Sequence, residues 1–445
     1  MDLNGFLSSF GNAGFIAVAF VVALSIIVTV HEYGHYIVGR WSGIRADVFS
    51  LGFGPVLIRR TDKRGTVWQV AAIPLGGYVK FHGDSNAASG KGDEEELAEM
   101  SAQELRTTLH GAPLWARAAT VLAGPVFNFI LSAIVFAGFL LVQGVPTNYG
   151  LVAEVAELPG VETTLQPGDQ ILEIAGVPIP EDEAFGEYLE SLPEQSMLPY
   201  LVRRDGQVIE LTAYHPRPAL VGFLSQAGAA ERAGIQVGDL ITVANGNPMA
   251  TFGSLQDVVV NGAGAPVALE LRRGDETVAL TLTPEARDEP DPDGGFRTVW
   301  RIGVGGDLLF APGPRPAGIG ESLAFGVTQT GEIISTSLSG LWAMISGQIG
   351  TCNISGPIGI AKVAGGAAER GISDFIWMVA VISTAIGLLN LFPIPVLDGG
   401  HLVFHAFEAI TGRPPSDRAL NILMTGGLIL VLSLMIFGLS NDLFC

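Results

Sequence analysis

The chain has 445 residues, of which 48% are hydrophobic and only 15% are charged, and its mean hydropathy is +0.42. This is too apolar for an ordinary soluble protein, so we expect a membrane protein. The formal net charge of -20 argues against a nucleic-acid binder, which needs a basic surface for phosphates. The only two cysteines, Cys352 and Cys445, exclude a disulfide scaffold and a CxxC zinc motif.

Four uncharged stretches are long enough to cross a bilayer as helices, which takes about 20 apolar residues. They predict spans at about 13–38, 118–142, 375–397 and 419–440. Residues 333–361 are also uncharged, but serine, threonine, glycine and proline interrupt them. This stretch is therefore expected to form an amphipathic helix on a surface and not a fifth span.

Basic residues predict the orientation of the spans. They are concentrated between spans one and two and between spans three and four, so these two loops are expected in the cytoplasm. Both termini and the stretch from about Gly144 to Asp374 then face the periplasm of a bacterium with two membranes. The chain is accordingly expected to be a multi-pass protein of the bacterial inner membrane.

One pattern occurs twice in the outward-facing stretch. PGDQILEIAGVPI, from Pro167, aligns with VGDLITVANGNPM, from Val237, within a region of short strand-like runs and glycine turns. The order of turns and strands resembles PDZ domains, which generally take an extended peptide with its terminal carboxylate as an added strand. Recognition of a peptide carboxyl terminus and a role as spacer or size filter both stay open.

These observations predict an α-helical polytopic membrane protein with a membrane-associated β-hairpin in the loop at 47–80 and two tandem β-rich PDZ domains on the outer side. The polar segment at 82–100 is expected to be disordered. The expected order of parts is a first membrane part at 1–144, PDZ domains at 145–216 and 217–286, a linker rich in proline and glycine at 287–320, an amphipathic membrane-proximal segment at 321–373, and a second membrane part at 374–445.

The motif HEYGH follows the first apolar stretch without a break. On a continued helix, His31 and His35 lie one turn apart on one face, within reach of a single ion, and this spacing is typical of zinc. Glu32 is then placed as the general base of a metal hydrolase. Ionisable side chains at membrane depth are costly and normally functional; buried polar groups that satisfy one another are the alternative.

A catalytic zinc has three protein ligands and an open position, so a third ligand is needed. Asp398 is the only carboxylate adjoining the inner end of span three, and two crossings separate it from HEYGH, so both lie at the cytoplasmic side. His401 and His405 are a competing pair one turn apart. No acid lies between them, and they follow two glycines where the span is expected to end, so we interpret them as supporting or structural.

The motifs together resemble the site-2 protease family of intramembrane zinc proteases, in the RseP-type form known from bacteria. The resemblance covers nearly the whole chain. It rests on HEYGH, GFGP, IPLGGYVK, AGPVFNF, the tandem PDZ repeat, SGPIGIAK and NLFPIPVLDGGH, in this order.

This resemblance implies a protease that cuts the transmembrane segment of single-pass proteins, such as a pre-clipped anti-sigma factor or remnant signal peptides. The implied site is one Zn²⁺ on His31, His35 and Asp398, the base Glu32, and substrate contacts at Asn390, Pro393 and Pro395. For Asn390, an interhelical hydrogen bond is the alternative. The rival function is a non-catalytic zinc-containing PDZ scaffold or chaperone. Expected partners are single-pass membrane proteins, membrane lipid and a peptide carboxyl terminus, with no nucleic acid.

Overall fold

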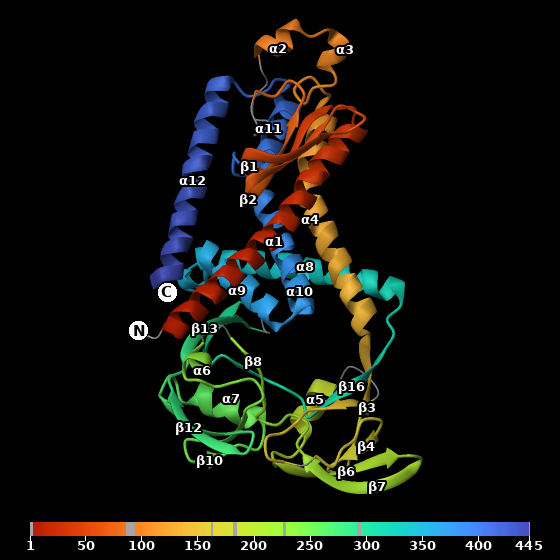
Figure 1. Ribbon diagram of the computed structural model, residues 1–445, viewed down its shortest axis with the longest axis vertical. Coiled ribbons are helices and arrows are strands. Elements are labelled where there is room, and N and C mark those ends of the chain that lie inside the picture. Colours follow the sequence, from red (N-terminus) through yellow and green to blue (C-terminus); the bar gives the residue numbers. More distant parts are fainter. Residues whose placement is uncertain are drawn as a thin grey trace. The chain divides into compact units, whose positions relative to one another are not determined.

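The computed structural model describes residues 3–85, 94–161, 163–180, 185–225, 228–291 and 295–444. The chain divides into two compact units (Figure 1). The membrane unit comprises Met1–Phe139, Ile319–Trp342 and Thr351–Cys445, and the β unit comprises Leu140–Gly318 and Ala343–Gly350. The β unit is therefore an insertion in the chain of the membrane unit.

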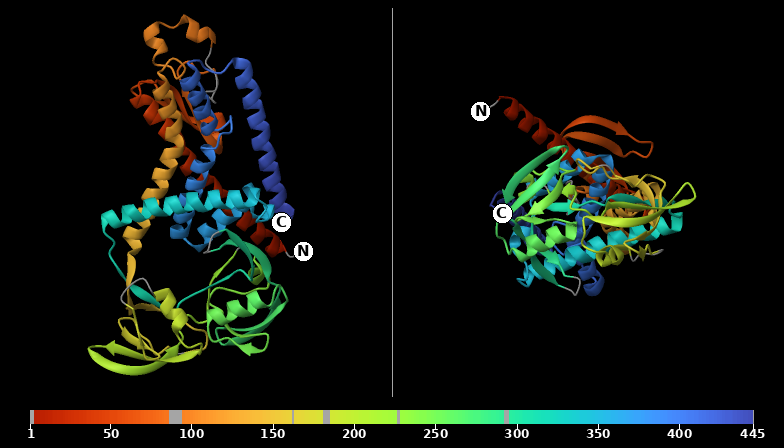
Figure 2. Two further views of the ribbon diagram at one scale, coloured as in Figure 1. Left: turned by 180° about the vertical axis from the view of Figure 1, so that it is seen from behind. Right: turned by 90° about the horizontal axis from the view of Figure 1, so that it is seen from below.

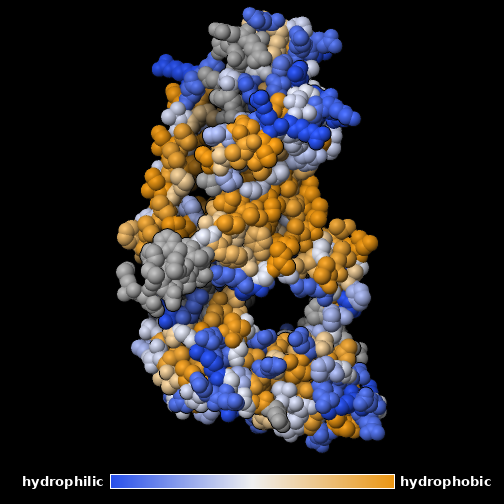
Figure 3. Space-filling view, viewed as in Figure 1, coloured by the Kyte–Doolittle hydropathy of each residue, from blue (hydrophilic) through white to orange (hydrophobic). Residues whose placement is uncertain are grey.

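Four helices in the described part of the chain are long and apolar enough to cross a bilayer. They are α1 (Leu3–Trp41), α4 (Leu114–Gln143), α10 (Ile372–Asn390) and α12 (Asp417–Phe444). Hydrophobic side chains cover the surface of the long helices in Figure 3. The prediction of a polytopic α-helical membrane protein is thus confirmed.

The third of these helices is shorter than the predicted 375–397. α10 ends at Asn390, and the turn at 391–397 leads into α11 (Asp398–Thr411). The two prolines of the turn oppose a continuous helix because they lack N–H groups and restrict the residues before them. α11 packs closely under the turn, since a Cβ at Gly399 or Gly400 would collide with the turn's backbone.

α1 and α10 both pack on α4 through small residues. A Cβ at Gly34 of α1 would lie 2.5 Å from the Ala123 carbonyl oxygen of α4, and a Cβ at Gly387 of α10 would lie 3.0 Å from the Phe129 ring of α4. Ser132 Oγ of α4 donates to the Ala380 carbonyl of α10 at 2.8 Å. Close backbone approach and interhelical hydroxyl bonds are the usual ways in which membrane helices associate.

The stretch predicted as amphipathic forms α8 (Ile319–Ile345), the short 3₁₀ helix η1 (Thr351–Asn353) and α9 (Pro357–Arg370). α8 is not among the candidate spans, and it runs crosswise to α4 and α12 in Figures 1 and 2. Its exposed apolar side chains include Leu323, Val327 and Trp342. These features are typical of a helix that lies on a membrane surface.

The first loop contains a hairpin of β1 (Ala46–Thr61) and β2 (Val67–Phe81) that folds on itself. The first half of β1 pairs with both ends of β2, so that Phe49 lies opposite Trp68 on one side and opposite Val79 on the other. Four half-strands thereby form a small sheet. The half-strand at 77–81 pairs on one side only and is an edge of this sheet.

Part of the polar segment at 82–100 is ordered, contrary to the prediction. It contains α2 (Glu94–Glu99), and α3 (Ala102–Leu105) follows. Ser101 and Glu104 close the start of α3 in a capping box, which stabilises even a short helix. Residues 86–93 lie outside the described residues.

The β unit contains two β subdomains, one for each copy of the repeat. The first has the strand order β16-β3-β4-β6-β7, and the second has a sheet β10-β9-β11-β12 and a ribbon β15-β8. The elements of the first are β3 (Val145–Val155), β4 (Gln170–Ile174), β5 (Val177–Pro178), α5 (Phe185–Ser191), β6 (Met197–Arg204), β7 (Gln207–Tyr214) and β16 (Phe310–Arg315). Those of the second are β8 (Val221–Leu224), α6 (Ala229–Arg232), β9 (Leu240–Ala244), β10 (Asn247–Pro248), α7 (Phe252–Asn261), β11 (Val267–Arg273), β12 (Glu276–Leu282) and β15 (Val304–Gly306).

The aligned aspartates of the repeat make the same contacts in both subdomains. Asp169 and Asp239 are each 1% exposed. Arg204 donates to both carboxylate oxygens of Asp169, each at 2.7 Å, and Arg273 does the same to Asp239 at 2.8 and 2.7 Å. Each aspartate also accepts a hydrogen bond from the backbone N–H of the residue three positions before it. The two subdomains are therefore built around one repeated ion pair.

The prediction of a linker at 287–320 is wrong. β13 (Glu285–Pro290) and β14 (Phe296–Arg301) form a ribbon there, β15 pairs with β8 of the second subdomain, and β16 pairs with β3 of the first. The proline content misled the prediction: Pro312 and Pro314 lie in β16, an edge strand, where a missing N–H group is tolerated. The first subdomain is thus completed by a strand that follows the second in sequence.

Candidate metal centre and active site

Three ligand atoms from α1 and α11 converge. His31 Nε2 lies 3.1 Å from His35 Nε2 and 3.1 Å from Asp398 Oδ2, and His35 Nε2 lies 3.5 Å from the same oxygen. Asp398 is the first residue of α11, where the glycines that follow it allow the fold-back. In the described part of the chain, this is the only group of three or more histidine, cysteine or acidic residues whose ligand atoms approach within 4.8 Å of one another.

The three atoms fit a zinc ion. Asp398 Oδ2 is buried and makes no hydrogen bond to the described residues, although two histidine nitrogens lie within 3.5 Å of it. Burying several lone-pair atoms close together is unfavourable unless a proton or a metal cation lies between them. A tetrahedral zinc with ligands at about 2.0–2.2 Å holds neighbouring ligand atoms about 3.3–3.6 Å apart, close to the separations seen here.

A carbonyl group of α4 orients His35. Its Nδ1 lies 2.8 Å from the Thr120 carbonyl oxygen, to which it donates. The proton on Nδ1 leaves the lone pair of Nε2 directed at Asp398 and His31. Metal-binding histidines are generally oriented by such a bond from the second ring nitrogen.

Asn128 of α4 orients His31, as the Thr120 carbonyl orients His35. Its side-chain amide lies 3.3 Å from His31 Nδ1, and its Oδ1 is buried with no hydrogen-bond partner in the described residues. With the amide turned by 180°, Oδ1 accepts the His31 Nδ1 proton, which satisfies that oxygen and frees Nε2 for a metal. In the sequence, this residue is distinguished only as an amide within an apolar stretch, which does not by itself indicate a contact with His31.

Gly124, also in α4, makes room for both imidazoles. A Cβ at this position would lie 2.8 Å from His31 Cε1 and would collide with the His35 ring. No periodicity in the sequence identifies this glycine as part of the site, because the contact joins two helices far apart in the chain.

Glu32 lines a cavity of about 470 Å³ together with the three candidate ligands. Its carboxylate is hydrogen-bonded to the backbone of Val79 in the edge half-strand at 77–81. Gly77 of the same half-strand also lies against Glu32, since a Cβ there would be 3.3 Å from Glu32 Cγ. The sheet edge and the candidate base are therefore in direct contact.

Asn390 also lines this cavity, at the end of α10. Its Nδ2 donates to the Ile386 carbonyl oxygen of its own helix at 3.1 Å. Among the described residues, its side chain makes no interhelical hydrogen bond. Pro393 and Pro395 lie in the turn at 391–397 and are not among the described residues that line the cavity.

The cavity continues along α11. His401 and His405 line it but do not belong to the group of three ligand atoms. Near its far end, Arg117 of α4 donates to both carboxylate oxygens of Glu408 at 3.0 and 2.6 Å. This bidentate pair holds α11 against α4 and thereby contributes to the position of Asp398.

The family model of peptidase family M50 matches residues 19–434. The chain belongs to peptidase family M50. A protein of Agrobacterium fabrum named for zinc metalloprotease activity is 36% identical to it over 100% of this chain and 98% of its own. The regulator of sigma-E protease RseP is 34% identical in Salmonella typhimurium and 33% in Escherichia coli, in both cases over 95% of this chain and 97% of the relative.

Membership of family M50 confirms several predictions. The protein is a membrane-embedded zinc metalloendopeptidase that performs regulated intramembrane proteolysis, it uses zinc, and it is a multi-pass protein of the inner membrane. The scaffold alternative is not favoured. A PDZ domain from Listeria monocytogenes is similar to 22% of this chain at 20% identity, but its TM-score of 0.18 supports no argument.

Proposed function

We propose that His31, His35 and Asp398 hold the catalytic zinc of this M50 protease and that Glu32 is its general base. The convergence of three ligand atoms from α1 and α11 carries this proposal. Bound zinc supplies a Lewis acid that polarises the scissile carbonyl and activates water. Glu32 accepts the proton of the attacking water and afterwards protonates the departing amine.

The edge half-strand at 77–81 orients the substrate in this proposal. A peptide bond within a helix must be unwound before a hydrolase reaches it, and an open sheet edge offers backbone groups to an extended peptide. This edge contacts Glu32 through Val79, and Asn390 lines the same cavity. We assign Asn390 to the substrate backbone, with Pro393 and Pro395 shaping the turn beside it.

The proposed substrates are single-pass membrane proteins, in particular an anti-sigma factor that has already been clipped outside, and remnant signal peptides. The names of the Salmonella and Escherichia coli relatives support the link to sigma-factor regulation.

We further propose that both termini and the β unit face the periplasm and that the zinc site lies near the cytoplasmic side. The arginines at the ends of the spans support this orientation. Cys352, between α8 and α9, is disulfide-bonded, as expected on an oxidising side of the membrane. The two β subdomains are proposed as PDZ domains, either receptors for a peptide carboxyl terminus or a size filter.

Cleavage of a tagged single-pass substrate in membranes tests the proposed site. The intact protein is compared with Glu32→Gln, with Asp398→Ala and with protein treated with a zinc chelator. We expect cleavage by the untreated intact protein alone, with Glu32→Gln retaining zinc and Asp398→Ala losing it. Equal cleavage in all four conditions would remove these residues from the proposed roles.

A further inference from the structure

A second cavity, of about 560 Å³, lies at the end of α1 and outside the zinc site. We call it the arginine pocket. Its lining comes from the end of α1, the start of β1, the turn between β1 and β2, and the segment at 101–107. The lining residues are Arg40, Gly43, Ile44, Arg45, Ala46, Arg64, Thr66, Ser101, Gln103, Glu104 and Thr107.

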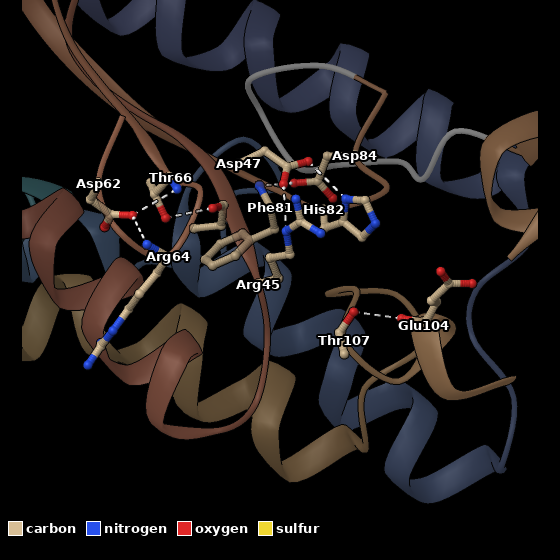
Figure 4. A network of polar contacts seen from close by, with 11 residues as sticks. Arg45, Asp47, Asp62, Arg64, Thr66, Phe81, His82, Asp84, Glu104 and Thr107 are labelled. Atoms are coloured by element: carbon tan, nitrogen blue, oxygen red, sulfur yellow. Dashed lines mark hydrogen bonds and ion pairs between the residues drawn. The ribbon is translucent and has the colours of Figure 1, made fainter. Parts of the chain in front are cut away.

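Three arginines contribute to this lining, against one acidic residue. The Arg64 side chain extends away from the Asp62 turn in Figure 4, and the contact of Arg64 with Asp62 is made by its backbone N–H and not by its guanidinium. Arg45 forms an ion pair with Asp47 through its Nε at 3.3 Å, and its side chain is 55% exposed, so its Nη groups can reach a further partner. Gln103 adds an exposed amide. This set of donors favours an anion with several oxygen atoms.

The acidic groups nearby are already engaged. Glu104, the one acid of the lining, turns its carboxylate back to the Ser101 N–H at 3.0 Å. Asp62 accepts the backbone N–H groups of Arg64 and Thr66 at 2.8 and 3.0 Å. Asp47 accepts a hydrogen bond from His82 Nδ1 at 2.9 Å. Both side chains are drawn in Figure 4. These carboxylates fix the shape of the pocket, and none of them forms an ion pair with the guanidinium of Arg64.

The pocket lies at the level of lipid headgroups. Trp41, the last residue of α1, is 75% exposed, and Trp115, in the first turn of α4, is 65% exposed. Exposed tryptophans at the ends of apolar spans mark the interface between membrane and water. Arg40 precedes Trp41 directly, so the arginine pocket opens where phosphates of the bilayer are concentrated.

We propose that the arginine pocket binds the phosphate of an anionic phospholipid headgroup. Arg45 and Arg64 hold the phosphate oxygens as bidentate donors, and Gln103 supplies a further hydrogen bond. Basic pockets beside membrane helices are suited to such headgroups. The site is separate from the zinc ligands and does not depend on the proposed function of those residues.

Titration of the detergent-solubilised full chain with phosphatidylglycerol or phosphatidylcholine, read by native mass spectrometry, tests the proposal. The pocket variant is Arg45→Gln with Arg64→Gln. The matched control is Arg59→Gln with Arg60→Gln, which removes the same charge from exposed positions in the same hairpin, outside the pocket. Thermal unfolding checks that both variants fold.

We expect the intact protein and the control to bind one phosphatidylglycerol in preference to phosphatidylcholine, and the pocket variant to bind it about tenfold more weakly. Equal binding by the pocket variant and the control overturns the proposal, as does equal affinity of the intact protein for the two lipids. Glycerol 3-phosphate forms a third arm. If it binds the intact protein as tightly as the lipid does, the ligand is a soluble phosphate and the lipid assignment is wrong.

Discussion

Asn128 holds the imidazole of His31, according to the hydrogen bond between its amide and Nδ1. We predict that Asn128→Leu weakens zinc binding about 10- to 100-fold, because partners of metal-binding histidines have effects of this size. Asn128→Asp, which keeps an acceptor oxygen, should retain more of the affinity. Competition with a chelator of known affinity measures this. Equal zinc affinity of the Leu variant and the intact protein would contradict the assignment.

Gly124 makes room for both histidine rings. We predict that Gly124→Ala abolishes zinc retention and cleavage, since the new methyl group would overlap the His35 ring. Gly138 of the same helix is the matched control, because a Cβ there would meet nothing within 4 Å. Gly138→Ala should leave zinc content and cleavage unchanged. Loss in both variants would mean that α4 itself, and not the site, is sensitive to the change.

The site residues that the sequence predicts differ from those it misses in how they reach the site, by spacing along the chain or by packing between helices. The spacing of His31, Glu32 and His35 along one helix is visible in the chain, and the crossing count selects Asp398. Thr120, Asn128 and Gly124 reach the site only through the packing of α4 on α1, which depends on small residues such as Gly34. No local pattern encodes such a tertiary contact.

At the scale of elements, Asp442 near the end of α12 caps α9. Its carboxylate accepts the backbone N–H groups of Gly356, Ile358 and Gly359 at 2.8–3.0 Å, and the glycine at the N-cap has no side chain of its own. We predict that Asp442→Ala lowers the free energy of unfolding by about 1–2 kcal/mol. Asp442→Asn should lose less. Denaturant unfolding of the full chain measures both, and no loss in the Ala variant would contradict the cap.

The buried ion pair of the first β subdomain predicts a dependence on pH. Burial, the largest single effect, raises the pKa of Asp169, but the hydrogen bonds from Arg204 and from the Gln166 N–H, together with the charge of Arg204, hold the pKa below its usual value. A lowered folded-state pKa stabilises the fold above the usual value of about 3.9, and this stabilisation is lost as the pH falls through the folded value.

We therefore expect Asp169→Asn to be less stable than the intact protein at neutral pH. The difference in the free energy of unfolding should shrink below about pH 4, where the carboxyl group becomes protonated. Thermal unfolding of the full chain across this range checks it. A difference that does not change with pH would mean that the charge of Asp169 contributes nothing.

Helices were predicted more completely than strands. Four apolar stretches are long enough to be recognised in isolation, and only the end of α10 was misplaced, because the turn at 391–397 is itself apolar. The sequence predicts a linker where the strands β13 to β16 lie, because proline and glycine normally interrupt sheets. The pairing partners of β15 and β16 lie far away in the chain, and no local pattern identifies them.

At the scale of the whole molecule, the pairing of β16 with β3 decides how the β unit is removed cleanly. A deletion of residues 150–286 would leave β16 paired with only the first part of β3, whereas a deletion of Val145–Arg315 removes both strands. If the subdomains act as a size filter, the larger deletion should speed the cleavage of intact, unclipped substrates. Loss of all cleavage, with zinc still bound, would favour recognition of a peptide terminus instead.

The same pairing sets an order of maturation during biosynthesis. β3 leaves the ribosome well before β16, so the first subdomain cannot complete its sheet until the second has been translated. Until then, part of β3 is an open edge, the kind of surface on which exported chains aggregate or recruit chaperones. A chain stalled between the two strands would thus display an unfinished sheet, even with the first two spans already inserted.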